Sequence, residues 1–298
     1  MSNVEISIVI GTFNRKRMLI NCIESIRNSG ITVPYEIIII DGGSDDGTTA
    51  WLSRQQDILT IIHHNRANED GHMVMKRSWG YFMNLGFRSA EGKYICMLSD
   101  DLYIHPNAIM SGYDLLEDDN HQTLGACAFP FRDYFISDQF FIYKAFEDKT
   151  LVNHGMYRRQ LLARLGWIDE VNYQFYLADT DLSLKIWNQG YQIAVSYNSL
   201  VEHFRYDFDS NRKENLSLSK KSRDSERFTQ IWGATLKKAP IIAKEYYPQI
   251  VKDLKMSYVP DGWIFKILFA KAWLKRALKA IPILYPLLRK MKNRSSSA

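Results

Sequence analysis

Two pairs of acidic residues stand where the sequence changes between apolar and polar segments. The first pair, Asp100 and Asp101, follows the apolar run Tyr94–Leu98 and precedes an amphipathic segment that starts at His105. A short apolar run between polar turns is typical of a strand buried on both faces of a parallel sheet. Ligands of such sheets bind just outside the carboxyl ends of the strands. The pair is therefore suited either to hold a divalent cation against a phosphate or to cap the next helix.

The second pair, Asp179 and Asp181, precedes a helical stripe formed by Leu182, Ile186 and Trp187. This pattern predicts that both carboxylates lie at the N-terminus of a helix. Capping and the helix dipole make an aspartate there stabilising by about 1 kcal/mol, which would by itself explain the pair. A catalytic carboxylate at the same place is the alternative.

A glycine-rich, acidic turn follows another apolar run, Tyr35–Ile40. Asp41 ends the predicted strand, and Gly42 and Gly43 let the backbone approach a ligand closely. A carboxylate there can accept hydrogen bonds from a nucleotide base or a ribose hydroxyl, although the same residues also form ordinary turns. Neither the Gly-Lys-Ser/Thr of a P-loop nor the Gly-x-Gly-x-x-Gly of a dinucleotide site is present.

Strands and helices alternate along the sequence. Apolar runs predict strands at Ile6–Ile10, Tyr35–Ile40, Ile58–His63, Tyr94–Leu98, Leu124–Phe129, Phe140–Phe146 and Gln192–Tyr197. Apolar periodicity predicts a helix that Asn14 caps and Gly30 ends, and another at Met73–Arg88 interrupted by Gly80 and Gly86. Such alternation implies βαβ units, so the predicted fold class is α/β, with a mostly parallel central sheet and helices on both faces.

Composition narrows the class of protein. The 298 residues are 46% hydrophobic and 24% charged, with a net charge of +5, which is ordinary for a globular chain. Cys22, Cys96 and Cys127 lie far apart in apolar runs, which indicates reduced core residues of a cytoplasmic protein. Residues 1–20 do not resemble a signal peptide, and no run of about eighteen uncharged apolar residues predicts a membrane span.

Five motifs, in order, resemble glycosyltransferase family 2, whose members are inverting enzymes with the GT-A fold. They are Ile10-Gly-Thr-Phe-Asn-Arg15, IIIIDGGSDDGT, Asn84-Leu-Gly86, Ala90-Glu-Gly-Lys-Tyr94 and SDD, and the resemblance covers about residues 4–206. It implies that Thr12, Asn14 and Asp41 line a nucleotide pocket, with Asp41 near the base.

The resemblance also implies a metal site. Asp101 matches the last carboxylate of the family's Asp-x-Asp motif, whereas Ser99 departs from the pattern at the first. Asp100 is expected to compensate as part of the nucleotide-sugar site. His203, after Val201-Glu202, is implied to contact the metal or the diphosphate. The other six histidines are interpreted as structural: His63, His64, His72, His105, His121 and His154.

The acidic pair near the second helix matches the family's Glu-Asp-x-Asp-Leu motif, except that Ala178 replaces the glutamate. The resemblance implies that Asp179 is the general base that takes the proton of the acceptor hydroxyl. The segment Asn153–Arg158 resembles the one that precedes the helix walling the acceptor site.

We expect residues 1–105 to form the nucleotide-sugar-binding half of one GT-A domain and 106–206 its acceptor-binding and catalytic half. Residues 207–298 are expected to add a flexible loop and a helical, basic C-terminal extension. Beyond Asp261 the extension mixes large apolar residues with lysines and contains no acid. That composition suits a helix lying on an anionic membrane, and the alternative is a helix packed on the catalytic domain.

Together these features predict a glycosyltransferase that moves a sugar from a UDP-, dTDP- or GDP-sugar to a glycan or glycolipid hydroxyl, in cell-surface polysaccharide synthesis. Mg²⁺ or Mn²⁺ is the expected cofactor, and no nucleic-acid partner is expected. The expected location is the cytoplasm, with peripheral contact to the inner face of the cell membrane. The alternatives are a non-catalytic nucleotide-sugar-binding protein and a sugar-1-phosphate nucleotidyltransferase. The latter needs a basic glycine-rich loop after the first strand, which Gly11–Asn14 is not.

Overall fold

The computed structural model describes residues 3–69, 72–134, 137, 139–204, 222–237 and 241–247, together with Ile267, Ala270 and Leu274. Residues 1–253 form one compact unit and residues 254–298 a second. In the second unit the three described residues are helical. The rest of the predicted basic helix, and most of the predicted loop at 206–224, lie outside the described residues. None of the helices in the described part of the chain has the length and apolarity needed to span a bilayer.

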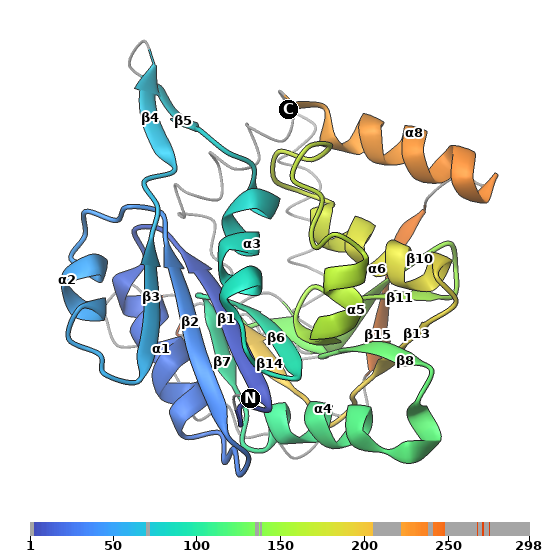
Figure 1. Cartoon of the computed structure of the whole chain (residues 1–298), viewed down its shortest axis with the longest axis horizontal. Helices are drawn as coiled ribbons and strands as arrows, with labels where there is room; N and C mark the ends of the chain where they lie inside the picture. Colours follow the sequence, from blue (N-terminus) through green and yellow to red (C-terminus); the bar gives the residue numbers. More distant parts are fainter. Residues whose placement is uncertain are drawn as a thin grey trace. The chain divides into compact units, whose positions relative to one another are not determined.

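A seven-stranded sheet forms the centre of the first unit (Figure 1). Its order is β13 (Gln192–Val195), β8 (Leu124–Ala128), β12 (Gly155–Arg158), β6 (Tyr94–Ser99), β1 (Ile6–Thr12), β2 (Tyr35–Asp41) and β3 (Ile58–Ile62). Only β12 runs antiparallel to its neighbours β6 and β8 within this sheet. The predicted mostly parallel α/β sheet is therefore confirmed, and the carboxyl ends of β1, β2 and β6 meet at one edge.

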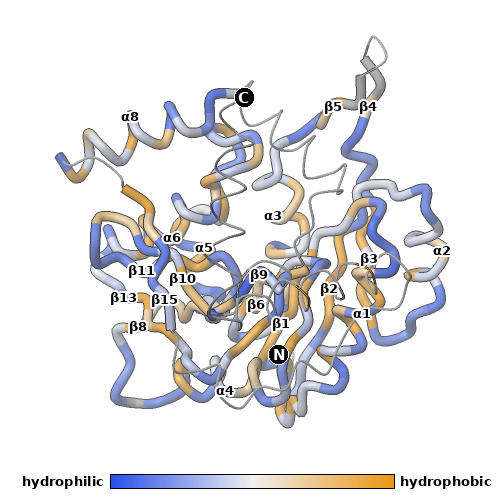
Figure 2. Tube along the Cα trace, turned by 180° about the vertical axis from the view of Figure 1, so that it is seen from behind, coloured by the Kyte–Doolittle hydropathy of each residue, from blue (hydrophilic) through white to orange (hydrophobic). Residues whose placement is uncertain are grey.

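Helices cover both faces of this sheet. The described helices of this unit are α1 (Lys16–Arg27), α2 (Thr48–Leu52), α3 (Trp79–Ser89), α4 (Ala108–Glu117), α5 (Arg159–Arg164), α6 (Ala178–Asn188) and α8 (Asp224–Leu236), with a 3-10 turn at Asp119–His121. Because strand side chains alternate, Val9 packs with α3, α5 and α6, whereas Ile8 and Ile10 pack with α1 and α4. The hydrophobic colour of β1 and β2 in Figure 2 follows from burial on both faces.

A second sheet lies beyond the end of β6. Its order is β11 (Lys149–Leu151), β10 (Phe140–Ala145), β9 (Phe131–Asp133), β14 (Val201–His203) and β7 (Leu102–Ile104), and β15 (Ile242–Tyr247) also pairs with β10. The turn containing Asp100 and Asp101 joins β6 to β7 and so connects the two sheets. The register of β14 pairs His203 with Leu102 on one side and with Asp133 on the other. Strand pairing therefore brings His203 to the acidic turn.

Two local predictions are wrong. The predicted helix at Met73–Arg88 begins later, because β5 (His72–Met75) pairs with β4 (Arg66–Glu69) and Ser78 caps α3 by accepting a hydrogen bond from the Tyr81 N–H. The hairpin β4–β5 projects from the unit in Figure 1. Asn14 does not cap α1; its side-chain oxygen instead accepts a hydrogen bond from the Asp45 N–H, which ties the turn after β1 to the turn after β2.

The two glycines that seemed to interrupt α3 serve close packing. A Cβ at Gly86 would lie 2.6 Å from Ile40 Cδ1 and 2.7 Å from Val9 Cγ1. At Gly80 it would lie 2.7 Å from the backbone oxygen of Asp169. The helix continues through both glycines because they let it approach the sheet and the segment before α6.

Gly86→Ala should therefore destabilise the protein. Overpacking against β1 and β2 costs about 1–3 kcal/mol, which exceeds the gain in helix propensity of up to about 1 kcal/mol. Urea unfolding followed by circular dichroism measures the difference. Ser89→Ala, at an exposed position of the same helix, is the control and should stay within about 0.5 kcal/mol. A stabilised Gly86→Ala variant would contradict the packing argument.

Candidate active site

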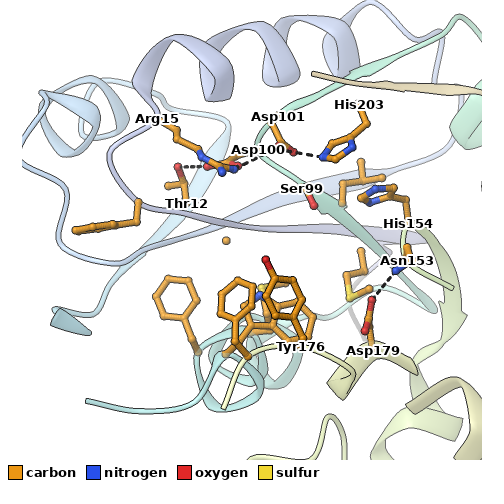
Figure 3. A pocket seen from close by; sticks show the side chains of 18 of the residues that line it. Thr12, Arg15, Ser99, Asp100, Asp101, Asn153, His154, Tyr176, Asp179 and His203 are labelled. Atoms are coloured by element: carbon orange, nitrogen blue, oxygen red, sulfur yellow. Dashed lines mark hydrogen bonds and ion pairs between the residues drawn. The ribbon is translucent and has the colours of Figure 1, made fainter. Parts of the chain in front are cut away.

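A cavity of about 520 Å³ opens where the ends of β1, β2 and β6 face β9, β14 and the start of α6. Five of the predicted site residues line it: Thr12, Asp100, Asp101, Asp179 and His203. Figure 3 shows the acidic turn on one side of the cavity and Asp179 on the other. The structure thus brings together residues that are up to 191 positions apart in the sequence (from 12 to 203).

The acidic turn is held by groups from the end of β1. Thr12 Oγ1 donates to Asp100 Oδ2 at 2.8 Å. Arg15 Nη1 donates to Asp100 Oδ1 at 2.8 Å and to Asp101 Oδ2 at 3.1 Å. One guanidinium therefore bridges both carboxylates, and it offsets part of their mutual repulsion.

The two carboxylates have unequal proton affinities. Burial raises the pKa of Asp100 to about 6, against the opposing charge of Arg15. Burial would also raise the pKa of Asp101, but the charges of His203 and Arg15 hold it well below its usual value. Asp101 is thus the member of the pair that stays ionised, and it is the better ligand for a cation.

His203 lies between two carboxylates. Its Nδ1 is 2.8 Å from Asp133 Oδ1, and its Nε2 is 3.4 Å from Asp101 Oδ2. Burial alone would lower the pKa of His203, but the two carboxylates raise it to about 9. The neighbouring His154, whose ring centre is 5.9 Å away, has its pKa lowered to about 3 by burial and by the His203 charge.

Asp179 enters the cavity from the first turn of α6. Its Oδ2 accepts a hydrogen bond from Asn153 Nδ2 at 2.8 Å, and its Oδ1 accepts one from the Thr180 N–H at 2.8 Å. Burial raises the pKa of Asp179, and these two donors oppose the rise. A carboxylate with a raised pKa, fixed in orientation and facing a cavity, is suited to accept a proton.

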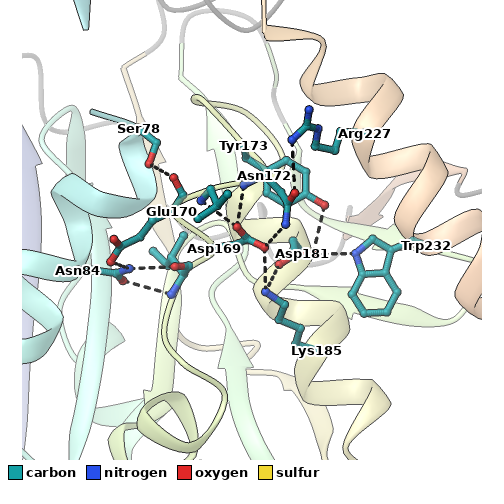
Figure 4. Close-up of polar contacts among 12 residues, drawn as sticks. Ser78, Asn84, Asp169, Glu170, Asn172, Tyr173, Asp181, Lys185, Arg227 and Trp232 are labelled. Atoms are coloured by element: carbon teal, nitrogen blue, oxygen red, sulfur yellow. Dashed lines mark hydrogen bonds and ion pairs between the residues drawn. The ribbon is translucent and has the colours of Figure 1, made fainter. Parts of the chain in front are cut away.

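Asp181 points away from the cavity. It is 1% exposed, and its Oδ1 accepts hydrogen bonds from Trp232 Nε1 at 2.9 Å and from the Tyr173 hydroxyl at 3.1 Å (Figure 4). Its Oδ2 pairs with Lys185 Nζ at 2.7 Å, one turn along α6. The two members of the acidic pair therefore face different surroundings, and Asp181 joins α6 to α8.

Asp41 and Asn14 do not line the cavity. Asp41 is fully buried, and its carboxylate accepts hydrogen bonds from the Ser44 N–H and hydroxyl and from the Thr49 hydroxyl. The two residues shape the turn from which Gly42 reaches the cavity. Their direct contact with a nucleotide stays a prediction.

Comparison with known proteins identifies the family of this chain. The sequence profile described as glycosyl transferase family 2 matches residues 7–161, more than half of the chain. The chain belongs to glycosyltransferase family 2. It is therefore a glycosyltransferase, and the prediction of an enzyme of this class is confirmed.

Curated relatives are up to 29% identical to this glycosyltransferase within the aligned segments. Chondroitin synthases of Pasteurella multocida (strain Pm70) and Escherichia coli are 28% and 29% identical over 41% and 40% of this chain. The chain spans 12% and 17% of their lengths. YwdF of Bacillus subtilis (strain 168), named an uncharacterized glycosyltransferase, is 28% identical over 84% of this chain and 96% of its own.

Solved structures agree on the fold. The mannosyltransferase PcManGT from Pyrobaculum calidifontis, in complex with GDP-Man and Mn²⁺, aligns over all of this chain and 81% of its own with a TM-score of 0.56 and 13% identity. Residues 1–349 of S. aureus TarS in complex with UDP-GlcNAc align over 79% of this chain and 74% of that one, with a TM-score of 0.52 and 12% identity. The predicted GT-A fold is confirmed.

The residues of this glycosyltransferase also fit a divalent cation. Asp101 Oδ1 is buried and has no hydrogen-bond partner within the part of the chain that the structure describes. Asp133 holds His203 Nδ1, so that Nε2 faces Asp101. A histidine whose second nitrogen contacts a carboxylate is the usual arrangement of a metal ligand. Among the described residues, no group of three or more His, Cys, Asp and Glu side chains could hold a metal, so Asp101 and His203 would share it with groups of the ligand.

Four residues of the site were missed in the sequence. Arg15 stands inside a motif that resembles the family's, yet nothing marks it as the partner of both carboxylates. Asp133 gains its role only through the pairing of β9 with β14. Asn153 and His154 lie in the segment assigned to the acceptor side, and His154 was interpreted as structural. The available signal was the position of Asn153 and His154, two adjacent polar residues directly before the buried strand β12.

The charges around His203 can be measured in the metal-free protein. In excess chelator we expect His203 to lose its proton near pH 9, its pKa being about 9, and His154 to stay neutral down to about pH 3, its pKa being about 3. Asp133→Asn should lower the pKa of His203, because the imidazolium loses a negative neighbour. NMR titration of the imidazole nitrogens measures both groups.

Asp118→Asn is the matched control, because Asp118 pairs with the exposed His121 at 3.8 Å and should leave His203 and His154 unchanged. Wild-type protein in which His203 titrates near the ordinary pKa of 6.5 would contradict the arrangement.

Proposed function

We propose that this glycosyltransferase moves a sugar from a nucleoside diphosphate donor to a hydroxyl of a glycan or glycolipid, with inversion. The observation that carries the proposal is the placement of Asp101 and His203 on one side of a single cavity and Asp179 on the other (Figure 3). The relatives named as chondroitin synthases support a polysaccharide product. The solved neighbours with GDP-Man and UDP-GlcNAc support a nucleotide-sugar donor.

On the donor side, Asp101 and His203 would hold a divalent cation, Mg²⁺ or Mn²⁺, together with the diphosphate. When bound, the cation neutralises charge on the leaving diphosphate. Thr12 and Arg15 keep Asp100 and Asp101 in place, and Arg15 adds a positive charge to this side of the cavity. The complex of PcManGT with Mn²⁺ supports the choice of cation.

On the acceptor side, Asp179 takes the proton of the attacking hydroxyl. Asn153 fixes the orientation of the carboxylate through Oδ2. The burial that raises the pKa of Asp179 makes it a stronger base than an exposed aspartate. Because the base and the diphosphate site face each other across the cavity, the hydroxyl attacks from the side opposite to the leaving group, which inverts the anomeric centre.

A panel of nucleoside diphosphates tests the donor site. We expect one of UDP, dTDP or GDP to raise the melting temperature, and Mn²⁺ to increase the shift. Saturation at a hundred times Kd stabilises by about 2.7 kcal/mol. Asp101→Asn should remove the Mn²⁺-dependent part and keep the fold. Full transferase activity in excess chelator would contradict the metal assignment.

The variant Asp179→Asn distinguishes two roles of Asp179, that of a general base and that of an aspartate that only stabilises the helix N-terminus. The amide accepts backbone hydrogen bonds nearly as well, so the melting temperature should change little. A neutral amide cannot take the proton, so turnover should fall by at least about a hundredfold. The panel identifies the nucleotide, and hydrolysis of commercially available sugars linked to that nucleoside diphosphate, with water as acceptor, measures turnover without knowledge of the natural acceptor.

The matched control is Asp181→Asn. Because Asp181 is buried against Lys185, this variant should lose thermal stability yet keep most of its activity per folded molecule. In the wild type, turnover should decline as the pH falls through the raised pKa of Asp179, since protonation removes the base. An active Asp179→Asn beside an inactive Asp181→Asn would move the base to Asp181.

A further inference from the structure

Aromatic side chains form a wall of the cavity beside the base. Trp79, Phe175 and Tyr176 line the cavity and are half-buried rather than enclosed. The ring centres of Trp79 and Phe175 are 6.3 Å apart, and those of Phe175 and Tyr176 are 4.9 Å apart. We call this set the aromatic shelf.

The aromatic shelf lies next to the base and away from the donor side. Tyr176 is three positions before Asp179, and Leu177 between them turns the chain into α6 with a φ of 71°. Figure 3 shows Tyr176 and Asp179 on one side of the cavity, with Asp100 and Asp101 on the other. A molecule resting on the shelf is therefore placed to present a group to Asp179.

We propose that the aromatic shelf binds the pyranose ring of the acceptor and presents its hydroxyl to Asp179. This inference rests on the proposed function, which requires an acceptor hydroxyl at that carboxylate. The apolar C–H face of a pyranose stacks on an aromatic ring, while its hydroxyls remain free at the rim to meet polar groups. Half-exposed rings offer such a face, because water covers them until the sugar displaces it.

Other aromatic residues near α6 are not available in this way. Tyr173 and Phe228 are 1% and 2% exposed, with ring centres 6.4 Å apart. They pack in the hydrophobic core between α6 and α8. The contrast between these enclosed rings and the half-exposed shelf identifies the shelf as the surface that can receive a ligand.

The turn that carries the shelf is held by a carboxylate from a distant segment. Asp224 is fully buried, and its oxygens accept hydrogen bonds from three consecutive backbone N–H groups, those of Gln174 at 2.8 Å and of Phe175 and Tyr176 at 3.0 Å. The Trp79 N–H in turn donates to the Gln174 carbonyl at 2.8 Å. Asp224 therefore acts as a positioning residue for all three rings.

A second contact fixes the helix that Asp224 begins. Trp232 of α8 donates to Asp181 of α6, so α8 is joined both to the catalytic helix and to the turn before it (Figure 4). Charged hydrogen bonds to buried groups are among the stronger ones in proteins. The shelf and the base are thus held by one set of contacts that involves α8.

Binding of simple pyranosides tests the shelf directly. The probes are methyl β-D-glucopyranoside, methyl β-D-galactopyranoside and methyl N-acetyl-β-D-glucosaminide, with sorbitol as a control that has hydroxyls but no ring. Saturation-transfer difference NMR measures binding and shows which sugar protons touch the protein. We expect at least one pyranoside to bind through its C–H face, and sorbitol not to bind.

Substitutions distinguish stacking from other roles. Tyr176→Ala should weaken binding of that pyranoside about tenfold, whereas Tyr176→Phe should keep it within about twofold, because the ring face and not the hydroxyl makes the contact. Tyr197→Ala, a 54% exposed tyrosine outside the cavity, is the control and should change nothing. Donor hydrolysis should be unchanged in Tyr197→Ala, and donor hydrolysis by the wild type, measured in parallel, tests the proposed function independently of the shelf.

Asp224→Ala should reproduce the loss seen in Tyr176→Ala, and Glu226→Ala, which removes an exposed carboxylate in the same turn of α8, should not. Should Asp224→Ala fail to fold, the Tyr176 variants still decide the matter. Failure of every pyranoside to bind the wild type, or unchanged binding in Tyr176→Ala, would overturn the shelf. Failure of the proposed function is seen separately, as absent donor hydrolysis or an active Asp179→Asn.

Discussion

The site depends on the balance of charges around Asp101. The pairing register of β14 with β7 and β9 creates this balance. The turn between β6 and β7 places two buried carboxylates side by side, an arrangement that is costly without counter-charges. Arg15 from the end of β1 and His203 from β14 supply those charges, and Asp133 from β9 holds His203. A one-residue slip of β14 would turn His203 to the other face of the sheet and leave Asp101 without its partner.

The proposed base, Asp179, is positioned by a helix and not by strand register. Asp179 and Asp181 are two residues apart in the first turn of α6, so they point in different directions around the helix. One enters the cavity, where burial raises its pKa and Asn153 orients it. The other enters the core, where Lys185 neutralises it and Trp232 binds it. Two carboxylates in one helical turn are thus separated, with Asp179 facing the cavity as the proposed base and Asp181 joining α6 to α8.

The sequence predicted well what depends on local pattern. The buried strands, the acidic turn after Leu98 and the helix that begins near Asp179 all follow from apolar periodicity and its interruptions. What it did not predict depends on pairing between distant segments. Asp133 acquires a role only when β9 pairs with β14, and Asp224 only when α8 packs on α6. The late start of α3 was missed because β5 is stabilised by its partner strand β4 and not by its own residues.

The two sides of the cavity are built from different parts of the chain. The family profile ends at residue 161, and it includes Thr12, Arg15 and Asp101 of the proposed donor side. The proposed base and the turn of the aromatic shelf lie beyond it, and Asp224 fixes that turn from a later segment still. His203 also lies beyond it, so the donor side closes only when β14 joins the second sheet. The described hydrogen bonds of Asp224 and those of Asp101 involve different residues. A substitution in α8 can therefore alter the aromatic shelf without changing the proposed nucleotide site. Under the proposed assignment, acceptor selectivity can therefore change while the donor chemistry stays the same.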